Sequence, residues 1–394
     1  MIDIKDIKSI TIIGAGTMGH EIAQVALMGG FSKVILNDLN LNALHQAVSK
    51  INQNLDKLES KGLLPENTSA KSLMKHLIQV ETLNDAIKDT DFIIEAIPEV
   101  MELKQELFTK LGELAPSHSI LATNTSTMSI TEIAKASGRP EKVVGMHFFT
   151  PIALLRLIEL IKGKKTSQET FELAAKVGKK FPALKGKRFI AKIEKESPGF
   201  IVNRLTITCS IFLSWLLDFA MESEIPIENV DNDFVSPPEL GPFAKWDYLG
   251  LDVVCDSMNY LAKQISSVFE PGRTLKTLVK QGNLGRKTGQ GIFKWSGNKP
   301  ILTSGEKAEL YSLEYYYAIL LNEGCRLLEE NIVSGYKIID NAMLAGMDMP
   351  GPFSVGKRKY KEWSDLLEEL AKKSNIEYLK PCRLMRTGNF INMK

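Results

Sequence analysis

Short apolar runs alternate with amphipathic stretches through the first half of the chain. Buried strands are predicted at residues 9–13, 33–38, 91–97, 119–125, 142–149 and 155–161, which are rich in β-branched and other apolar residues. Helices are predicted between them at residues 39–58, 100–114 and 129–137, where apolar positions recur with helical spacing. Strands that alternate with helices predict an α/β domain with a parallel sheet covered on both faces.

The pattern changes after about residue 195, where Ser-Pro-Gly at 197–199 interrupts it and long helical periodicities follow. This part is predicted to be all-α. Segments 222–243 and 329–353 each contain an Asp-Asn pair followed by Gly-Pro-Phe. A diverged repeat explains this similarity, although chance likeness of two helix–loop segments would also do so. The sequence therefore predicts a first domain at 1–195 and two copies of a helical domain at 196–300 and 301–394.

Composition excludes several classes of protein. The 49 Lys and Arg residues nearly balance the 47 Asp and Glu residues, which gives no electrostatic support for binding nucleic acid or a membrane surface. The four cysteines show no CxxC spacing, so neither a zinc site nor a disulfide framework is expected. No signal peptide is evident, and the apolar stretch 211–221 contains Asp218 and is too short to span a bilayer. We expect a soluble cytoplasmic protein.

A glycine-rich loop follows the first predicted strand and opens a helix. Residues 14–19 read GAGTMG, and we expect Gly14, Gly16, Thr17, Met18 and Gly19 to contact a dinucleotide. The first glycine makes a tight turn, the second admits the pyrophosphate and the third lets helix and strand pack closely. Asp38 ends the second predicted strand, where a carboxylate binds the ribose hydroxyls of NAD and repels the 2′-phosphate of NADP. A structural glycine turn without a ligand is the alternative to this Rossmann-type NAD site.

One histidine has the surroundings of a catalytic base. His147 lies near the end of a predicted buried strand, and ligands bind at strand carboxyl ends in open parallel sheets. Glu159 interrupts the apolar run LRLIELI, and a buried carboxylate there needs a partner. Pairing with His147 would fix the imidazole tautomer and stabilise the imidazolium. On spacing alone, a buried structural histidine fits equally well.

Several motifs together resemble the L-3-hydroxyacyl-CoA dehydrogenases, including the dehydrogenase part of multifunctional β-oxidation enzymes. The resemblance covers residues 8–300. Its motifs are GAGTMG, EAIPE at 95–99, NTST at 124–127, GMHFFTP at 145–151, LIELI at 157–161, SPGFIVNR at 197–204 and KTGQGIFKW at 287–295. The order of HFF, the glutamate strand and PGFIVNR makes the match specific.

The resemblance implies roles for individual residues. His147 would take the proton of the substrate 3-hydroxyl, and Glu159 would orient it. Ser126 would form a hydrogen bond near the hydroxyl of the coenzyme A thioester substrate and near the nicotinamide. Asn203 would hold substrate oxygens. Glu99, Lys104 and Lys294 match positions that contact the cofactor.

Other positions depart from the family pattern. Asparagine usually follows HFF and binds the nicotinamide amide, whereas Thr150 stands here with a shorter polar side chain. Asn54 stands where the family has a serine near coenzyme A, and Lys61 keeps the residue type expected beside a CoA phosphate. An exposed, solvated lysine is the alternative interpretation of Lys61.

The resemblance implies NAD-dependent, reversible oxidation of a short-chain (S)-3-hydroxyacyl-CoA, such as 3-hydroxybutyryl-CoA. Two alternatives stay open: a dehydrogenase of free hydroxy acids or sugar acids, and a noncatalytic NAD-binding protein. Because multifunctional relatives carry two helical copies within one chain, this protein is expected to be a monomer with an internal pseudo-dimer, or a homodimer.

Overall fold

The protein, as a computed structural model, forms two compact units. The structure describes residues 3–235, 239–303 and 305–393. The first unit contains Met1–Phe200 and the short segment Asn341–Met349, and the second contains Ile201–Asp340 and Pro350–Lys394. The predicted boundary at residue 195 lies close to the division at residue 200. The second unit holds most of both predicted helical copies.

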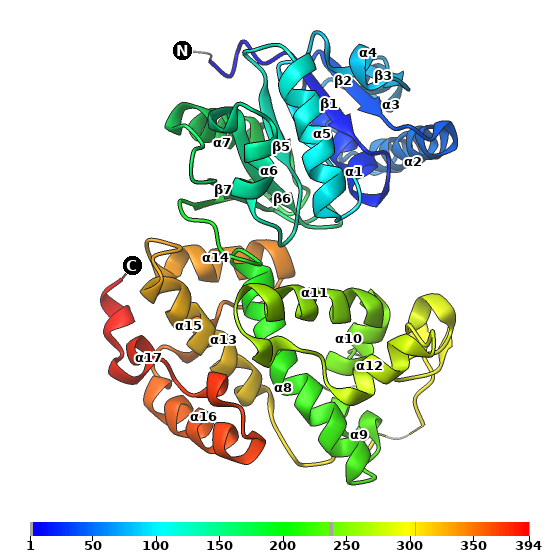
Figure 1. Ribbon diagram of the computed structural model, residues 1–394. Helices are drawn as coiled ribbons and strands as arrows, with labels where there is room; N and C mark the ends of the chain where they lie inside the picture. The colour runs from blue at the N-terminus through cyan, green and yellow to red at the C-terminus, as the bar shows by residue number, and fades with distance from the viewer. Residues whose placement is uncertain (1–2, 236–238, 304, 394) are drawn as a thin grey trace. The chain divides into compact units, whose positions relative to one another are not determined.

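An eight-stranded sheet forms the centre of the first unit (Figure 1). Its strands are β1 (Ser9–Ile13), β2 (Lys33–Asn37), β3 (Leu77–Val80), β4 (Phe92–Glu95), β5 (Ile120–Thr123), β6 (Val143–Phe148), β7 (Leu157–Ile161) and β8 (Phe189–Ile193). They lie in the order β3-β2-β1-β4-β5-β6-β7-β8. The order of the strands reverses at β1, with β2 and β3 on one side and β4 onward on the other. Sheets of this kind bind nucleotides in the crevice at that point.

The sheet differs from the prediction in two respects: β7 runs antiparallel to β6, and two further strands are present. All six predicted strands are present, but β6 and β7 run antiparallel, with His147 opposite Glu159. The connection between them is a loop without a helix, so a parallel crossover is impossible. Strands β3 and β8 were not predicted. β3 is short, and its middle residues Ile78 and Gln79 are exposed, so it lacks the continuous apolar run of a buried strand.

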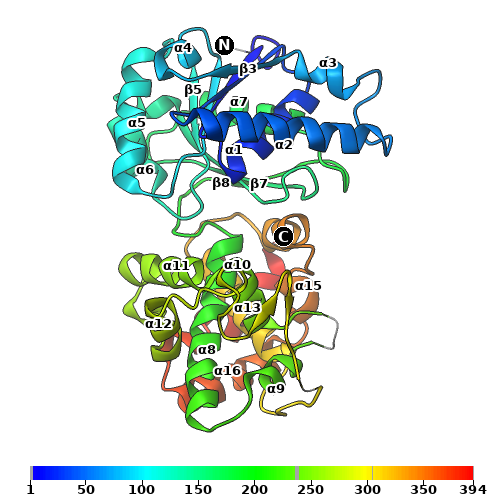
Figure 2. The same cartoon turned by 90° about the vertical axis from the view of Figure 1, so that its right-hand side faces the viewer.

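Helices cover both faces of this sheet. One large apolar core joins residues of α1 (Thr17–Met28), α2 (Leu41–Glu59) and α7 (Gln168–Lys180) to one sheet face. Helices α5 (Met101–Leu114) and α6 (Ile130–Ala136) pack together on the sheet in Figure 1. Figure 2 shows α1 and α2 on the other side from α5 and α6. Two short helices, α3 (Ala70–Met74) and α4 (Leu83–Ile87), complete the unit before β4.

The second unit is almost entirely helical, as predicted. Its first half contains α8 (Val202–Glu222), α9 (Ile227–Asn232), α10 (Pro242–Leu249), α11 (Leu251–Gln264) and α12 (Arg273–Lys280), followed by the small hairpin β9 (Trp295–Ser296) and β10 (Lys299–Pro300). Its second half contains α13 (Leu313–Glu329), α14 (Tyr336–Met347), α15 (Pro352–Gly356), α16 (Tyr360–Ser374) and α17 (Arg383–Thr387). The end of α14 belongs to the first unit.

The two predicted repeat segments make the same local contacts. The carboxylate of Asp231 accepts hydrogen bonds from the amides of Phe243 and Ala244 at 2.8 and 2.9 Å. Asp340 likewise accepts the amide of Phe353, at 2.9 Å. In each case the acid binds the start of the helix opened by Gly-Pro-Phe, which explains why both motifs keep that spacing. Residues 236–238 of the first segment lie outside the described residues.

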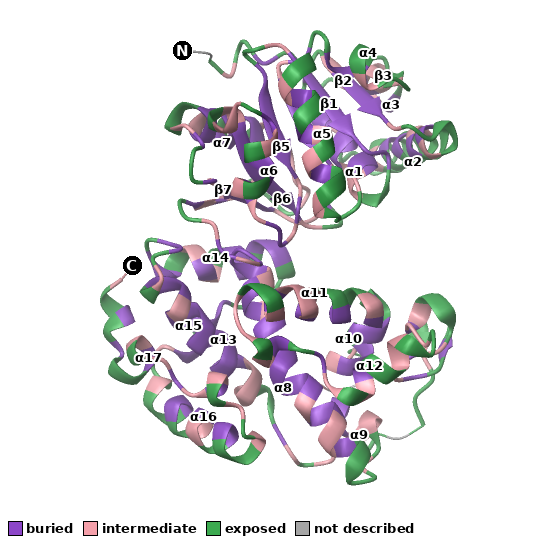
Figure 3. Ribbon diagram, in the orientation of Figure 1, coloured by how far each residue is buried: buried purple, intermediate pink, exposed green. Residues whose placement is uncertain are grey.

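Helix α8 is the hydrophobic centre of the second unit. Among the helices that the structure describes, α8 alone has the length and apolar composition to cross a membrane. However, 67% of its most apolar 18-residue stretch is buried within the protein. Figure 3 shows buried residues along much of α8 and α13. A buried core helix accounts for this composition.

Candidate active site

The glycine loop has the geometry that a bound pyrophosphate needs. Gly14 has a φ of +102°, and a Cβ there would lie 2.5 Å from the carbonyl oxygen of Ala96. A Cβ on Gly19 would lie 1.7 Å from the carbonyl oxygen of Gly14, so only glycine permits this contact between helix and loop. Gly16 faces open space. The loop thus presents an uncovered backbone and the amino end of α1 to an anion.

Asp38 lies beside this loop, directly after β2. Its Oδ2 accepts the amide of Ala15 at 2.7 Å, and its Oδ1 accepts the amide of Asn40 at 2.8 Å. These contacts hold the carboxylate at the carboxyl edge of the sheet, and each oxygen keeps a lone pair for a ribose hydroxyl. Thr17 is exposed and Met18 half-buried at the start of α1. The residues of the loop therefore fit a dinucleotide without a 2′-phosphate.

His147 and Glu159 meet across the antiparallel pair of strands. Nδ1 of His147 lies 2.7 Å from Oε2 of Glu159, and the two residues are 6% and 0% exposed. The carboxylate fixes Nδ1 as the protonated nitrogen of the neutral imidazole. No described residue hydrogen-bonds to Nε2, which is the nitrogen left to accept a proton.

Two aromatic rings and one amide define the surroundings of His147. The rings of Phe149 and Phe200 lie with centroids 4.4 and 5.8 Å from the imidazole. The side chain of Asn124 accepts the amide of Phe148 at 3.0 Å, which ties the end of β6 to the segment after β5. The imidazole is therefore held in place and largely removed from water. The sequence had drawn attention to Asn124, Phe149 and Phe200 only as members of motifs.

Ser126 is held by a network of charges in which Lys104 and Glu95 are buried and Glu99 is exposed. Oε1 of Glu99 accepts the Ser126 amide at 2.8 Å and its hydroxyl at 3.2 Å. Nζ of Lys104 lies 3.2 Å from Glu99 and 2.6 Å from Glu95, and Lys104 is 1% exposed. The hydroxyl of Thr123 donates to Glu95 at 2.6 Å. The network connects β4, β5 and α5 at the carboxyl edge of the sheet.

The two carboxylates of this network differ in electrostatics. Complete burial raises the pKa of Glu95, despite the opposing effect of the Lys104 charge. Burial also acts to raise the pKa of Glu99, but the Lys104 charge and the hydrogen bonds from Thr125 and Ser126 bring it below its ordinary value. The sequence did not single out Glu95 as the buried partner of Lys104. The signal was the one used for Glu159, because both are carboxylates inside apolar strands.

Thr150 lies on the loop after β6, and the two predicted CoA-binding residues lie on α2 or just after it. The hydroxyl of Thr150 donates to the carboxylate of Glu21 on α1 at 3.0 Å. Asn54 on α2 is exposed and its amide donates to Gln24 at 3.0 Å. Lys61 is exposed just after α2. Its ammonium group makes no ion pair with any residue that the structure describes.

Two further predicted residues belong to the second unit. Asn203 lies in the first turn of α8, and Lys294 is exposed and pairs through an isolated bridge with Gln290. Next to Asn203, the buried guanidinium of Arg204 forms ion pairs with Glu323 on α13 and Glu330 after it. Arg204 thereby joins the two halves of the helical unit.

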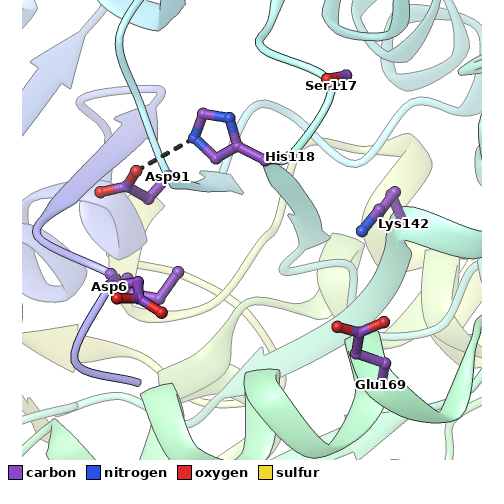
Figure 4. Close-up of a pocket in the computed structure, with 7 residues that line it drawn as sticks. Asp6, Asp91, Ser117, His118, Lys142 and Glu169 are labelled. Carbon is purple, nitrogen blue, oxygen red and sulfur yellow. Dashed lines mark hydrogen bonds and ion pairs between the residues drawn. The ribbon is translucent and has the colours of Figure 1, made fainter. Parts of the chain in front are cut away.

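A cavity of about 600 Å³ lies at the other end of the strands from this site, near their amino ends (Figure 4). It is lined by Asp6, Ile7, Asp91, Ser117, His118, Lys142 and Glu169. Nε2 of His118 lies 3.2 Å from Oδ1 of Asp91. All of the lining residues but Glu169, which lies in the first turn of α7, precede the amino ends of β1, β4, β5 and β6. The glycine loop and His147 lie at the carboxyl ends of their strands. The cavity is therefore separate from the candidate active site.

The part of the chain that the structure describes contains no cluster of metal ligands. No three His, Cys, Asp or Glu side chains there are grouped as a metal site requires. The described residues include a glycine-rich loop before α1, a carboxylate beside that loop and a histidine paired with a glutamate. Together they define a nicotinamide-dependent dehydrogenase.

Comparisons with known proteins identify the kind of dehydrogenase. Residues 9–188 match the family described as "3-hydroxyacyl-CoA dehydrogenase, NAD binding domain", and residues 199–295 match "3-hydroxyacyl-CoA dehydrogenase, C-terminal domain". The chain is 34% identical over 300 residues to a 3-hydroxybutyryl-CoA dehydrogenase of Bradyrhizobium diazoefficiens, covering 75% of this chain and 98% of that protein. It is 36% identical over 296 residues to a mitochondrial hydroxyacyl-coenzyme A dehydrogenase of Rattus norvegicus, covering 73% and 91%.

Solved structures agree. A 3-hydroxybutyryl-CoA dehydrogenase from Escherichia coli shares the fold over 98% of this chain and 99% of its own, with a TM-score of 0.83 and 24% identity. An (S)-3-hydroxybutyryl-CoA dehydrogenase from Ralstonia eutropha covers 74% of this chain and 99% of its own, with a TM-score of 0.64 and 29% identity. The chain belongs to the 3-hydroxyacyl-CoA dehydrogenase family and is an NAD-dependent oxidoreductase.

Proposed function

We propose that this protein oxidises short-chain (S)-3-hydroxyacyl-CoA thioesters to 3-oxoacyl-CoA, and that 3-hydroxybutyryl-CoA and acetoacetyl-CoA are its substrate pair. The observation that carries the proposal is the 2.7 Å contact between Nδ1 of His147 and Glu159, which leaves Nε2 for the substrate. A histidine held in this way is a general base in one direction and a general acid in the other.

The chain's residues divide the work of the reaction. Nε2 of His147 accepts the proton of the 3-hydroxyl, and the Glu159 carboxylate stabilises the resulting imidazolium. NAD, held by residues 14–19 and Asp38, would supply the acceptor for the hydride of C3. Ser126, held by Glu99, hydrogen-bonds to the substrate oxygen beside the nicotinamide, and Asn203 binds a further substrate oxygen. In the reverse direction, the imidazolium returns its proton to the 3-oxo oxygen.

The cofactor is bound by the loop and network already described. Residues 14–19 would hold the pyrophosphate and Asp38 the adenosine ribose. Glu99, Lys104, Thr150 and Lys294 are proposed contacts to the remainder of NAD. The buried position of Lys104 indicates that it acts largely by fixing Glu99. Lys61 and Asn54 are proposed to bind coenzyme A, and the ammonium of Lys61, which pairs with no residue that the structure describes, suits a phosphate.

The decisive experiment is a spectrophotometric assay with purified protein. Acetoacetyl-CoA with NADH should be turned over far faster than acetoacetyl-CoA with NADPH or free acetoacetate with NADH. Binding of NADH without thioester turnover would transfer support to a free hydroxy acid or sugar acid. If NADH is bound but neither the thioester nor a panel of free hydroxy acids and sugar acids is turned over, the result would support a noncatalytic protein.

The two halves of the helical unit are proposed to be copies of one domain. Matching orders of helices and the matching contacts of Asp231 and Asp340 support this. The second copy would then provide an internal partner in place of a second subunit, and the soluble, cytoplasmic enzyme would be a monomer. Sedimentation near the 43.9 kDa chain mass supports this proposal, whereas a tight homodimer contradicts it.

A further inference from the structure

The loop at residues 149–156 connects the strand of His147 to the strand of Glu159. It joins β6, which ends at Phe148, to β7, which begins at Leu157. Tight hairpin loops of about two to five residues set strand register by themselves, but this loop is longer. A slip of one residue would turn Glu159 to the opposite face of the sheet. The pairing of base and acid therefore depends on what holds the loop.

Glu21 holds the loop from the cofactor helix. It lies on α1, two residues after the last glycine of the nucleotide loop. Its Oε2 accepts the amide of Ile152 at 2.6 Å, and its Oε1 accepts the hydroxyl of Thr150 at 3.0 Å. Ile152 is fully buried. Without this carboxylate its amide would lose its partner in a place that water reaches poorly.

Arg188 holds the same loop from the other side. It precedes β8, and its guanidinium donates to the carbonyl of Leu155 at 2.6 Å and to that of Ile152 at 3.1 and 3.2 Å. It also donates to the carbonyls of Phe181 and Pro182. Burial lowers the pKa of Arg188 to about 10. No described carboxylate forms an ion pair with Arg188. Its charge is therefore stabilised by these four backbone carbonyls.

Ile152 is consequently held by a charged side chain on each side of its own backbone. Glu21 accepts from its amide and Arg188 donates to its carbonyl. We propose that Glu21 and Arg188 are positioning residues for catalysis: they fix the 149–156 loop and thereby set the register in which Glu159 orients His147. The inference rests on the proposed role of His147 as the base. Neither residue needs to touch the substrate.

The first test compares Glu21→Ala with Glu21→Gln. Glu21→Ala should lower kcat about 10- to 100-fold, since a misplacement of about 1 Å in a reacting group has an effect of this size. KM for acetoacetyl-CoA should change much less. Glu21→Gln keeps one oxygen for the Ile152 amide and should restore most of kcat. If Glu21→Ala keeps the wild-type kcat, Glu21 is removed from the proposal.

A second readout separates positioning from partial unfolding. With NADH deuterated at the transferred position, the isotope effect on kcat should rise in Glu21→Ala and Arg188→Lys, because misplaced groups slow the chemical step. A smaller active fraction would lower kcat and leave the isotope effect unchanged, which would overturn the proposal. The low-field proton resonance of the His147–Glu159 hydrogen bond should weaken in both variants and return in Glu21→Gln.

Lys192→Ala is the matched control. Lys192 is also a cation of this region, on β8, but it pairs with Glu172 at 2.6 Å and makes no described contact to the loop. Its replacement should leave kcat and the isotope effect at wild-type values. His147→Gln distinguishes the two levels of the argument. If it is inactive while Glu21→Ala and Arg188→Lys are fully active, the proposed function survives and this inference fails; if it is active, the proposed function itself fails.

Discussion

His147 and Glu159 face each other in register across β6 and β7, with Nδ1 of the imidazole 2.7 Å from Oε2 of the carboxylate. This contact fixes the tautomer of the imidazole near the carboxyl ends of the strands, where the nucleotide loop also lies. Because β7 pairs directly with β6, the carboxylate that contacts His147 comes from the neighbouring strand. The antiparallel pairing of β6 with β7, beyond which β8 runs parallel to β7, thus brings the two side chains together.

We predict that His147→Gln folds normally and loses about 10³- to 10⁴-fold in kcat, because base catalysis and its geometry are removed together. Glu159→Gln should lose less, since the base remains and only its orientation and charge stabilisation are impaired. Steady-state kinetics and thermal unfolding measure both effects. His118→Gln is the control, because His118 is exposed at the opposite edge of the sheet and should have wild-type activity. Near-native turnover of His147→Gln would exclude this histidine as the base.

We predict that Asp38→Ala raises KM for NAD about 10- to 100-fold, the effect of losing one or two hydrogen bonds to a charged acceptor. KM for the thioester should stay nearly constant. Discrimination against NADP should also fall, because the repulsion of a 2′-phosphate is removed. Initial rates with both cofactors measure this, and the exposed carboxylate of Asp85 on α4 provides the control variant Asp85→Ala. Equal increases in KM for NAD and thioester would contradict the ribose assignment.

The sequence predicted the contact of His147 with Glu159, but it did not predict the side chains that hold the loop between their strands. Glu159 and His147 were found because a polar residue within a buried apolar strand requires a partner. The same argument applies to Glu95, but it lies within a motif that was used only for the resemblance. Glu21 and Arg188 carry no such signal, since their partners are backbone groups of a loop whose path depends on tertiary structure.

The sheet shows the same limit. Strands β1, β4 and β6 were predicted because they are buried on both faces and read as continuous apolar runs. The edge strand β3 has exposed positions and gives no such run. The direction of β7 was missed because periodicity identifies a strand and does not identify its neighbours or orientation. The segment 341–349 likewise joins the first unit through contacts such as Arg156 to Ala345, which no local pattern encodes.

The buried ion pair of Lys104 with Glu95 leads to a separate prediction about stability. Lys104→Met should destabilise the first unit by about 3–5 kcal/mol, because it leaves buried Glu95 without its cation. Lys104→Met combined with Glu95→Gln removes both charges and should recover much of that stability. NADH affinity should stay reduced in the double variant, since Glu99 still lacks the lysine that fixes it. Urea unfolding followed by circular dichroism, with NADH titrations, tests this; additive losses in the double variant would show that the two residues are not coupled.

The second unit offers a test of pH dependence through Asp231. Its carboxyl is 5% exposed, and burial raises its pKa to about 7, despite two backbone hydrogen bonds that act in the opposite direction. The folded state therefore binds a proton more tightly than the unfolded state, whose aspartate has a pKa of about 3.9. The folding free energy should weaken as pH rises from about 4 to 7 and level off above that.

Tryptophan fluorescence isolates this effect, because Trp215, Trp246, Trp295 and Trp363 make up the four tryptophans of the chain and all belong to the second unit. Urea unfolding at pH 5 and pH 8 should show a loss in wild-type stability that exceeds the loss in Asp231→Asn by about 2–3 kcal/mol. The Asn variant is expected to be less stable at both pH values, because its amide NH₂ faces a backbone N–H, yet its pH slope should be smaller. Identical slopes for the two proteins would show that Asp231 stays ionised in the folded state, held by its bonds to Phe243 and Ala244.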